Sequence, residues 1–166
     1  MDYFEEIKKL VESGQLNKAI TVCKKWCGEE PDNHKTWYNL GTIFYMDGDT
    51  NAAEKALKRS IEIDSNYVYS LSNLGSVYCC KKKFRQAIPF FEKARSLAKS
   101  ENDKSEILSK LADAHLNCEQ YKNASLLIGE LYKTNEELAM TLEGKMIREV
   151  IPCKSKPKRK KSKRRK

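Results

Sequence analysis

Residues 37–63, WYNLGTIFYMDGDTNAAEKALKRSIEI, decide the fold of this chain, because their pattern returns 34 positions later. The positions that coincide after this shift are Leu40-Gly41 with Leu74-Gly75, Phe44 with Tyr78, Ala53 with Ala87, and Leu57 with Phe91. A period of this length is typical of a helical solenoid, in which each repeat buries its apolar face against the next. Within the stretch, Asp47-Gly48-Asp49 supplies a turn between two predicted helices, since glycine accepts the left-handed conformation that closes a helix.

The spacing of these residues resembles the tetratricopeptide repeat family, whose pattern has Trp or Leu, then Leu-Gly, Tyr, Ala, Phe or Leu, and Pro at set offsets. The resemblance implies an all-α fold, a right-handed α-solenoid of antiparallel helix pairs. We expect about four repeats, at about 1–33, 34–67, 68–101 and 105–138, and a capping helix at about 135–150. The solenoid would then occupy residues 1–151, and residues 152–166 would form a disordered basic tail.

The predicted helices of the first three repeats cover about 2–13 and 16–28, 35–47 and 50–63, and 69–81 and 84–98. The fourth repeat matches when three additional residues within Ser100–Lys104 are placed in a longer loop. Thr134 with Glu137 fits a capping box at the start of the last helix.

Small residues of the pattern are predicted where the two helices of one repeat approach most closely. We expect Gly41, Gly75 and Ala112 to face Ala53, Ala87 and Ala124, respectively. The larger members, Phe44, Tyr78, Leu57, Phe91 and Ile128, would fill the space between successive repeats. These residues are therefore assigned to the core and not to chemistry.

The formal charge of +9 comes from one end of the chain. Residues 154–166 hold ten Lys or Arg among thirteen residues, which leaves 22 basic and 23 acidic residues elsewhere. The core of this run resembles basic nuclear-import signals, and the run could also bind the phosphates of RNA or DNA through salt-sensitive contacts. The residues proposed for either role are Lys156, Lys158, Arg159, Lys160, Lys161, Arg164 and Arg165. A solvated charge run with no dedicated partner is the third alternative.

Cysteine and histidine do not form a recognisable catalytic or metal motif. Cys23 and Cys27 with His34 are the nearest candidate for zinc, but tetrahedral zinc needs four ligands, so buried thiols that act as apolar filler are favoured. His115 stands at a core position of the fourth repeat. No Gly-rich phosphate loop and no G-x-S-x-G occurs, so we expect no enzyme, no metal and no cofactor.

The first ten residues show no apolar stretch of signal-peptide length, and no run approaches the roughly 18 to 20 apolar residues that span a bilayer. We therefore expect reduced cysteines, no membrane partner and a cytoplasmic protein, with nuclear import if the source is a eukaryote.

A peptide-binding site is implied by the resemblance, because solenoids of this family bind peptides in the concave groove lined by the first helix of each repeat. The groove residues carried over to this sequence are Lys8, Lys35, Tyr38, Asn39, Thr42, Tyr45, Tyr69, Asn73, Ser76 and Lys110. Further positions on the same helices are Phe4, Glu5, Ser72, Glu106, Ser109 and Asp113.

Asn39 and Asn73 occupy the same position in consecutive repeats, and each amide could pair with the backbone of a bound peptide. Alternatively, these amides bond only across helices. The neighbouring tyrosines Tyr38, Tyr45 and Tyr69 either offer contact area to a ligand or pack between repeats.

The best-known subgroup of the family clamps a C-terminal carboxylate, as in chaperone tails, with Lys and Asn in one repeat, Asn in the next, and Lys and Arg in a third. This pattern of clamp residues can be aligned on Asn39 or on Asn73 of the sequence. Neither alignment supplies the Lys and Arg pair, so the sequence argues against a chaperone-tail partner. We expect a non-catalytic adaptor that binds an extended or helical segment of a partner protein in the groove. The alternative is a nucleic-acid- or ribosome-associated protein in which the tail supplies affinity and the repeats recruit a partner.

Overall fold

The computed structural model describes residues 2–150, and this part of the chain contains nine α-helices and no strand. The helices are α1 (Tyr3–Glu12), α2 (Leu16–Glu29), α3 (His34–Met46), α4 (Thr50–Ile63), α5 (Val68–Cys80), α6 (Phe84–Leu97), α7 (Glu101–Asn117), α8 (Tyr121–Leu131) and α9 (Glu136–Val150). The predicted basic tail lies outside the described residues. No helix within residues 2–150 combines the length and apolar character needed to cross a membrane.

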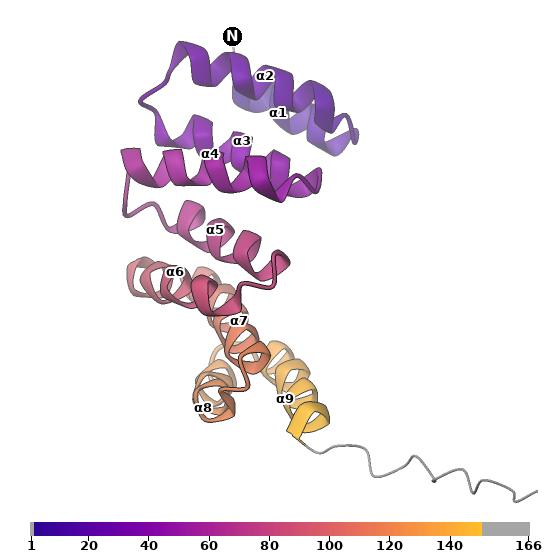
Figure 1. Ribbon diagram of the computed structural model, residues 1–166, viewed down its shortest axis with the longest axis vertical. Helices are drawn as coiled ribbons and strands as arrows, with labels where there is room; N and C mark the ends of the chain where they lie inside the picture. Colours follow the sequence, from indigo (N-terminus) through magenta and orange to yellow (C-terminus); the bar gives the residue numbers. More distant parts are fainter. Residues whose placement is uncertain (1, 151–166) are drawn as a thin grey trace, which may run out of the picture.

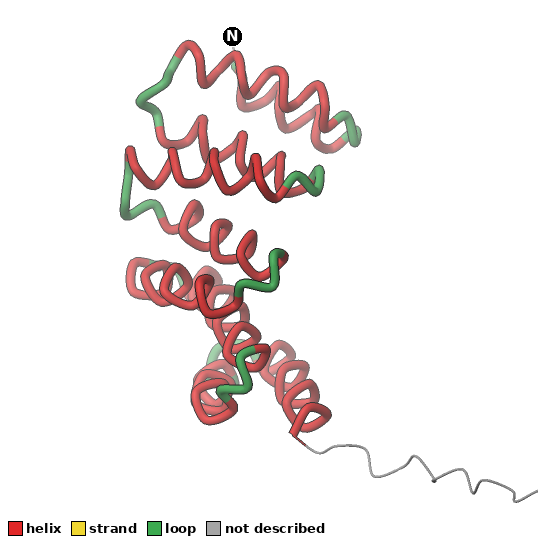
Figure 2. Tube along the Cα trace, viewed as in Figure 1, coloured by secondary structure: helices red, strands yellow, loops and turns green. Residues whose placement is uncertain are grey.

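The helices stack in pairs, and each helix packs against the next one in the chain (Figure 1). Short loops join them at the two edges of the stack (Figure 2). In addition, α3 contacts α5, and α5 contacts α7, so the first helices of successive pairs form a row. The last helix, α9, packs against both α7 and α8 and so covers the C-terminal end of this row. The predicted all-α solenoid is confirmed.

The core consists of two clusters of buried side chains. One cluster joins α1 to α4 around Ile7, Ala19 and Cys23, and the other runs from α4 to α9. Phe44 packs against both clusters, so the core continues through the stack. The alanines of the repeat pattern, Ala53, Ala87 and Ala124, are fully buried, as the sequence predicted.

The glycines of α3 and α5 lie opposite a larger partner than expected. A Cβ atom on Gly41 would lie 2.7 Å from Cγ of Leu57, and one on Gly75 would lie 2.6 Å from Cε1 of Phe91. The nearest contacts of these glycines are therefore Leu57 and Phe91, and their predicted pairing with Ala53 and Ala87 stays a prediction. Leu57 and Phe91 thus fill space within their own repeat, since the absence of a glycine side chain leaves room for them.

The loop predicted within Ser100–Lys104 is wrong. α7 begins at Glu101, and the Ser100 side chain caps it by accepting a hydrogen bond from the Asp103 amide at 3.0 Å. Glu101 and Asp103 in the first turn suit the positive end of the helix dipole. The added residues thus lengthen α7 to 17 residues and bring Asp103 close to α5.

The cap of α9 differs from the predicted capping box. The Leu138 amide donates to Oδ1 of Asn135 at 3.1 Å, whereas the Thr134 hydroxyl donates to the carbonyl of Leu131 at 3.3 Å. Asn135 is therefore the N-cap, a position that asparagine fills as well as serine does. The Thr134 hydroxyl is used by the end of α8 instead.

Candidate functional site

The row of α3, α5 and α7 carries two cavities. The first, called here the tyrosine cavity, has a volume of about 160 Å³. Its lining residues are Tyr38, Val68, Tyr69, Ser72, Asn73, Asp103, Glu106 and Ile107. The second, the C-terminal cavity, has a volume of about 540 Å³ and also reaches α9. Its lining residues are Tyr45, Ser76, Cys79, Cys80, Phe84, Ser109, Lys110, Asp113, Asn117, Leu142 and Lys145.

The two cavities lie one helical turn apart along α5 and α7. Ser72 lines the first and Ser76 the second, and the same step on α7 runs from Glu106 to Lys110. Residues four positions apart lie on the same helix face, so the two hollows share one face of the stack. We call the pair of cavities the groove.

A cluster of tyrosines lies at one end of the groove. The ring centroid of Tyr38 lies 5.3 Å from that of Tyr67 and 6.2 Å from that of Tyr69, and Tyr67 and Tyr69 are 5.5 Å apart. Tyr69 is 46% exposed, whereas Tyr38 is half-buried. Tyr67 was not predicted for the site, because it precedes the first turn of α5 and so falls outside the helix face that the family register describes.

Three tyrosines in or beside the groove, Tyr38, Tyr45 and Tyr67, have raised pKa values and are neutral near pH 7. Burial raises the pKa of Tyr67 to about 12 and also raises the pKa of Tyr38. The hydrogen bond to the Cys80 thiol, followed by burial, raises the pKa of Tyr45 to about 12. These side chains therefore present uncharged aromatic faces and hydroxyl groups to a ligand.

Asn73 uses part of its amide inside the stack. Its Nδ2 donates to the Thr42 hydroxyl at 2.9 Å, and that hydroxyl donates to the Tyr38 carbonyl at 2.9 Å. This is the cross-helix bond that the sequence left as an alternative to a ligand role. Asn39 is half-buried and lines neither cavity.

Six of the predicted groove residues line the two cavities, and four do not. The six are Tyr38, Tyr45, Tyr69, Asn73, Ser76 and Lys110; the four are Lys8, Lys35, Asn39 and Thr42. Lys8 and Lys35 are exposed on α1 and α3. Asp103 and Lys145 also line the groove but were not predicted. Asp103 had been assigned to a loop, and α9 had been treated only as a cap.

The charged side chains that line the C-terminal cavity each have an ion-pair partner. Nζ of Lys145 binds Oδ1 of Asp113, and Nζ of Lys110 binds Oε1 of Glu106 at 2.6 Å. Lys110 also donates to the Ser72 hydroxyl at 3.2 Å, which joins α7 to α5. This half of the groove thus offers a ligand mostly apolar and neutral polar surface.

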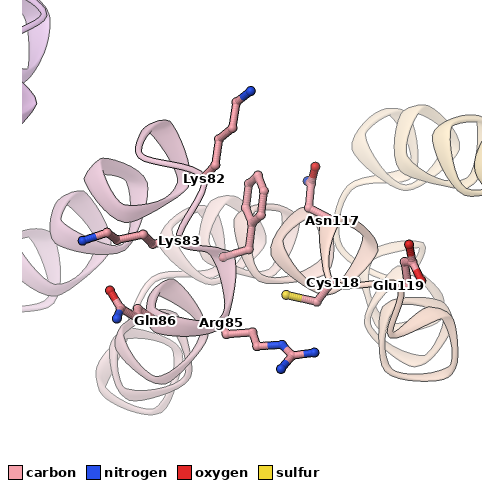
Figure 3. Close-up of a pocket in the computed structure, with 8 residues that line it drawn as sticks. Lys82, Lys83, Arg85, Gln86, Asn117, Cys118 and Glu119 are labelled. Atoms are coloured by element: carbon pink, nitrogen blue, oxygen red, sulfur yellow. The ribbon is translucent and has the colours of Figure 1, made fainter.

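A third cavity, of about 550 Å³, lies at the edge of the stack between the α5–α6 and α7–α8 turns. Figure 3 shows that the amine ends of Lys82 and Lys83, which line it, point away from each other. Because these charges do not converge on one point, we place the candidate site in the groove and not at this edge.

Cys23, Cys27 and His115 belong to the packed interior of the stack. Cys23 and Cys27 are buried in the core, and burial raises the pKa of the Cys23 thiol to about 12. His115 is buried, and its Nδ1 lies 2.5 Å from Oε1 of Gln120.

Comparisons with known proteins identify the repeat. Models of the tetratricopeptide repeat match residues 34–67 and 70–105. Mitochondrial import receptor subunit TOM70 of Homo sapiens is 28% identical over 118 residues, which cover 70% of this chain and 19% of the receptor. This chain therefore spans about a fifth of the length of that relative.

Two solved structures share the fold. PilF of Pseudomonas aeruginosa superimposes with a TM-score of 0.79 at 14% identity and covers 87% of this chain and 66% of its own. YrrB, described as a repeat protein of this family with an unusual peptide-binding site, superimposes with a TM-score of 0.70 at 15% identity and covers 87% of this chain and 83% of its own. Proteins of this family mediate protein–protein interactions and are typically non-catalytic scaffolds. From the matched repeats and the shared helical stack, the chain is a tetratricopeptide repeat protein with about four repeats.

Proposed function

We propose that this protein is a non-catalytic adaptor that binds an extended segment of a partner protein in its groove. The main observation in support of this proposal is that the two cavities lie one helical turn apart along α5 and α7. A segment that lies across both cavities would contact α3, α5, α7 and α9 at once.

The side chains of the groove support this proposal. Tyr69 offers a large and partly exposed ring, which orders at low entropic cost because only two side-chain torsions become fixed. Oδ1 of the Asn73 side-chain amide accepts no hydrogen bond from residues 2–150, so it is available to a peptide amide. Contacts of this kind bind the backbone of a partner with little dependence on the partner's sequence.

The family also supports the proposal, since YrrB carries a peptide-binding site by its description and TOM70 is an import receptor. The alternative of nucleic-acid binding or nuclear import depends on residues 154–166, which lie outside the described residues. It therefore stays a prediction from the sequence.

Cross-linking mass spectrometry of the full-length protein, purified with its partner from source cells, tests this proposal. We expect cross-links from Lys110 and Lys145, which line the C-terminal cavity, to one segment of the partner. The Tyr69→Ala variant should recover about tenfold less of that partner, because exposed aromatic residues at interface centres carry much of the binding energy. Leu126→Ala is the matched control, since Leu126 is 67% exposed on α8 and lines neither groove cavity.

The proposal is wrong if Tyr69→Ala and Leu126→Ala recover the same amount of partner. Cross-links that join the partner only to α6 and α8 would also contradict it.

A further inference from the structure

Asp103 and Tyr69 stand between two hollows at the N-terminal end of the groove. Both residues line the tyrosine cavity, and both also line a neighbouring cavity of about 420 Å³ that we call the flanking cavity. The Tyr69 hydroxyl donates to Oδ2 of Asp103 at 3.4 Å, which holds the carboxylate beside the ring. A ligand that enters either hollow meets this pair.

The charge around this pair is negative. Asp64, Asp103 and Glu106 line the two cavities, and Lys99 is the single lysine or arginine among the described residues that line them. Glu106 is paired with Lys110, and Asp64 lies 3.8 Å from Nε2 of His34. By contrast, no lysine, arginine or histidine of residues 2–150 forms an ion pair with Asp103.

The aromatic faces reinforce the preference for a cation. The ring planes of Tyr38 and Tyr67 are inclined by 82°, those of Tyr38 and Tyr69 by 45° and those of Tyr67 and Tyr69 by 70°. Tyr38 and Tyr69 line the tyrosine cavity together with Asp103, and Tyr67 lines the flanking cavity with it. A neutral aromatic ring carries negative potential on its face and attracts a cation within about 6 Å of its centre. Phenol rings and a carboxylate therefore select the same kind of ligand group.

The other half of the groove lacks this combination. There Asp113, the one carboxylate among the described lining residues, is already bound to Lys145. An incoming cation would have to displace a lysine in the C-terminal cavity, whereas at Asp103 it would not.

We infer that the tyrosine cavity takes the guanidinium group of an arginine side chain in the partner's segment. This inference rests on the proposed function and adds the chemistry of one subsite. A volume of about 160 Å³ suffices for such a group, because cavities of about 150 Å³ hold a molecule of the size of benzene. Arginine suits the site better than lysine, since its planar group stacks on tyrosine while it donates two parallel hydrogen bonds to a carboxylate. A partner's C-terminal carboxylate would instead meet Asp103 and Glu106 and be repelled.

Selection from a displayed library of random 12-residue peptides tests the subsite. The full-length protein should enrich arginine in the selected peptides, and the Asp103→Asn variant should not. Asp32→Asn is the matched control, because Asp32 lies in the turn between α2 and α3, lines neither groove cavity and is 91% exposed.

A double-mutant cycle on one selected peptide then isolates the contact. Replacing its arginine by citrulline, which has the same shape without the charge, should weaken binding to the wild-type protein about tenfold and binding to Asp103→Asn by less than twofold. Tyr69→Phe should retain most of the affinity, whereas Tyr69→Ala should lose about tenfold, because stacking needs the ring and not the hydroxyl. Circular dichroism melts of each variant confirm that it is folded.

Selected peptides bind through the groove if they lose affinity for the Tyr69→Ala variant. If such peptides show no arginine enrichment, the inference is wrong and the proposed function still stands. A library that yields no groove-dependent peptide would count against both. If Asp103→Asn abolishes self-association of the protein without changing the selected peptides, the occupant is the basic segment of another copy, and the inference about a partner is wrong.

Discussion

The second repeat, α3–α4, closes its helical hairpin with Gly48 at a φ of 88°, whereas the third, α5–α6, places Lys82 in the same position at a φ of 57°. The Asp49 side chain then caps α4 by accepting hydrogen bonds from two backbone amides, whereas the equivalent Lys83 provides no side-chain cap for α6. The two repeats nevertheless fold alike. Their helix contacts therefore determine the hairpin, and the turn chemistry only adjusts its stability.

The two repeats also differ where each meets the next one. Glu54 on α4 accepts hydrogen bonds from the Tyr78 hydroxyl at 3.1 Å and from Nζ of Lys58 at 2.7 Å, and it also forms an ion pair with Lys81. The position 34 residues later holds Ile88, which packs against the apolar core. At this position one junction is thus ionic and the other apolar, although the helices pack in the same order.

The largest effect should come from the contact that both repeats share. Gly75→Leu should lower the free energy of unfolding by about 3 kcal/mol, because even its Cβ would overlap the ring of Phe91. Urea denaturation followed by circular dichroism measures this change. Gly129→Leu on α8 is the control, because its Cβ would meet no atom within 4 Å, and it should be neutral or stabilising. Equal free energies of unfolding for the wild type and Gly75→Leu would show that this contact does not stabilise the helical hairpin.

A smaller effect, with a defined pH dependence, should distinguish the ionic junction. The hydrogen bonds from Lys58, Lys81 and Tyr78 lower the pKa of Glu54 from 4.5 to about 2. Because the folded state holds the proton less tightly than the unfolded state, this stabilisation is present above pH 4.5 and is lost as the pH falls toward 2. Glu54→Gln should therefore cost about 1–2 kcal/mol at pH 7, after allowance for solvent screening, and progressively less below pH 4.5.

Urea denaturation at a series of pH values measures the difference between the wild type and Glu54→Gln. Glu62→Gln is the control, because Glu62 pairs with Arg59 on the exposed surface of the same helix and should contribute at most about 0.5 kcal/mol. A difference at Glu54 that stays constant from pH 7 to pH 3 would contradict the ionic description of this junction.

The smallest effect should come from exchanging the turn residues. Lys82→Gly should stabilise the protein by about 0.5 kcal/mol, since glycine relieves the left-handed strain but adds freedom to the unfolded chain. Gly48→Lys should destabilise it by about 1 kcal/mol. Thermal melts of the two variants give the comparison, and a shift of both in the same direction would refute this account of the turns.

Much of the groove surface could be predicted once the repeat register was known. Tyr38, Tyr69 and Asn73 follow from their positions on α3 and α5, because a helix presents residues at fixed intervals to one face. The place of Asp103 in the groove could not be predicted, since the three added residues could form either a loop or a helical turn. In the structure the Ser100 side chain caps α7, so these residues form a helical turn. Tyr67 was missed because it lies before its helix, where the helical period gives no direction for a side chain.

The sequence by itself determined the period, the helix pairs and the buried small residues, because steric fit between neighbouring helices leaves few residue types at those positions. Only the tertiary structure decided that Gly41 and Gly75 face Leu57 and Phe91. It also decided which carboxylates of the groove have a cation and which one does not, because that depends on side chains from α3, α5, α7 and α9 meeting in space. Local pattern therefore determined the scaffold, whereas the charge of the binding surface arose from contacts between residues far apart in the chain.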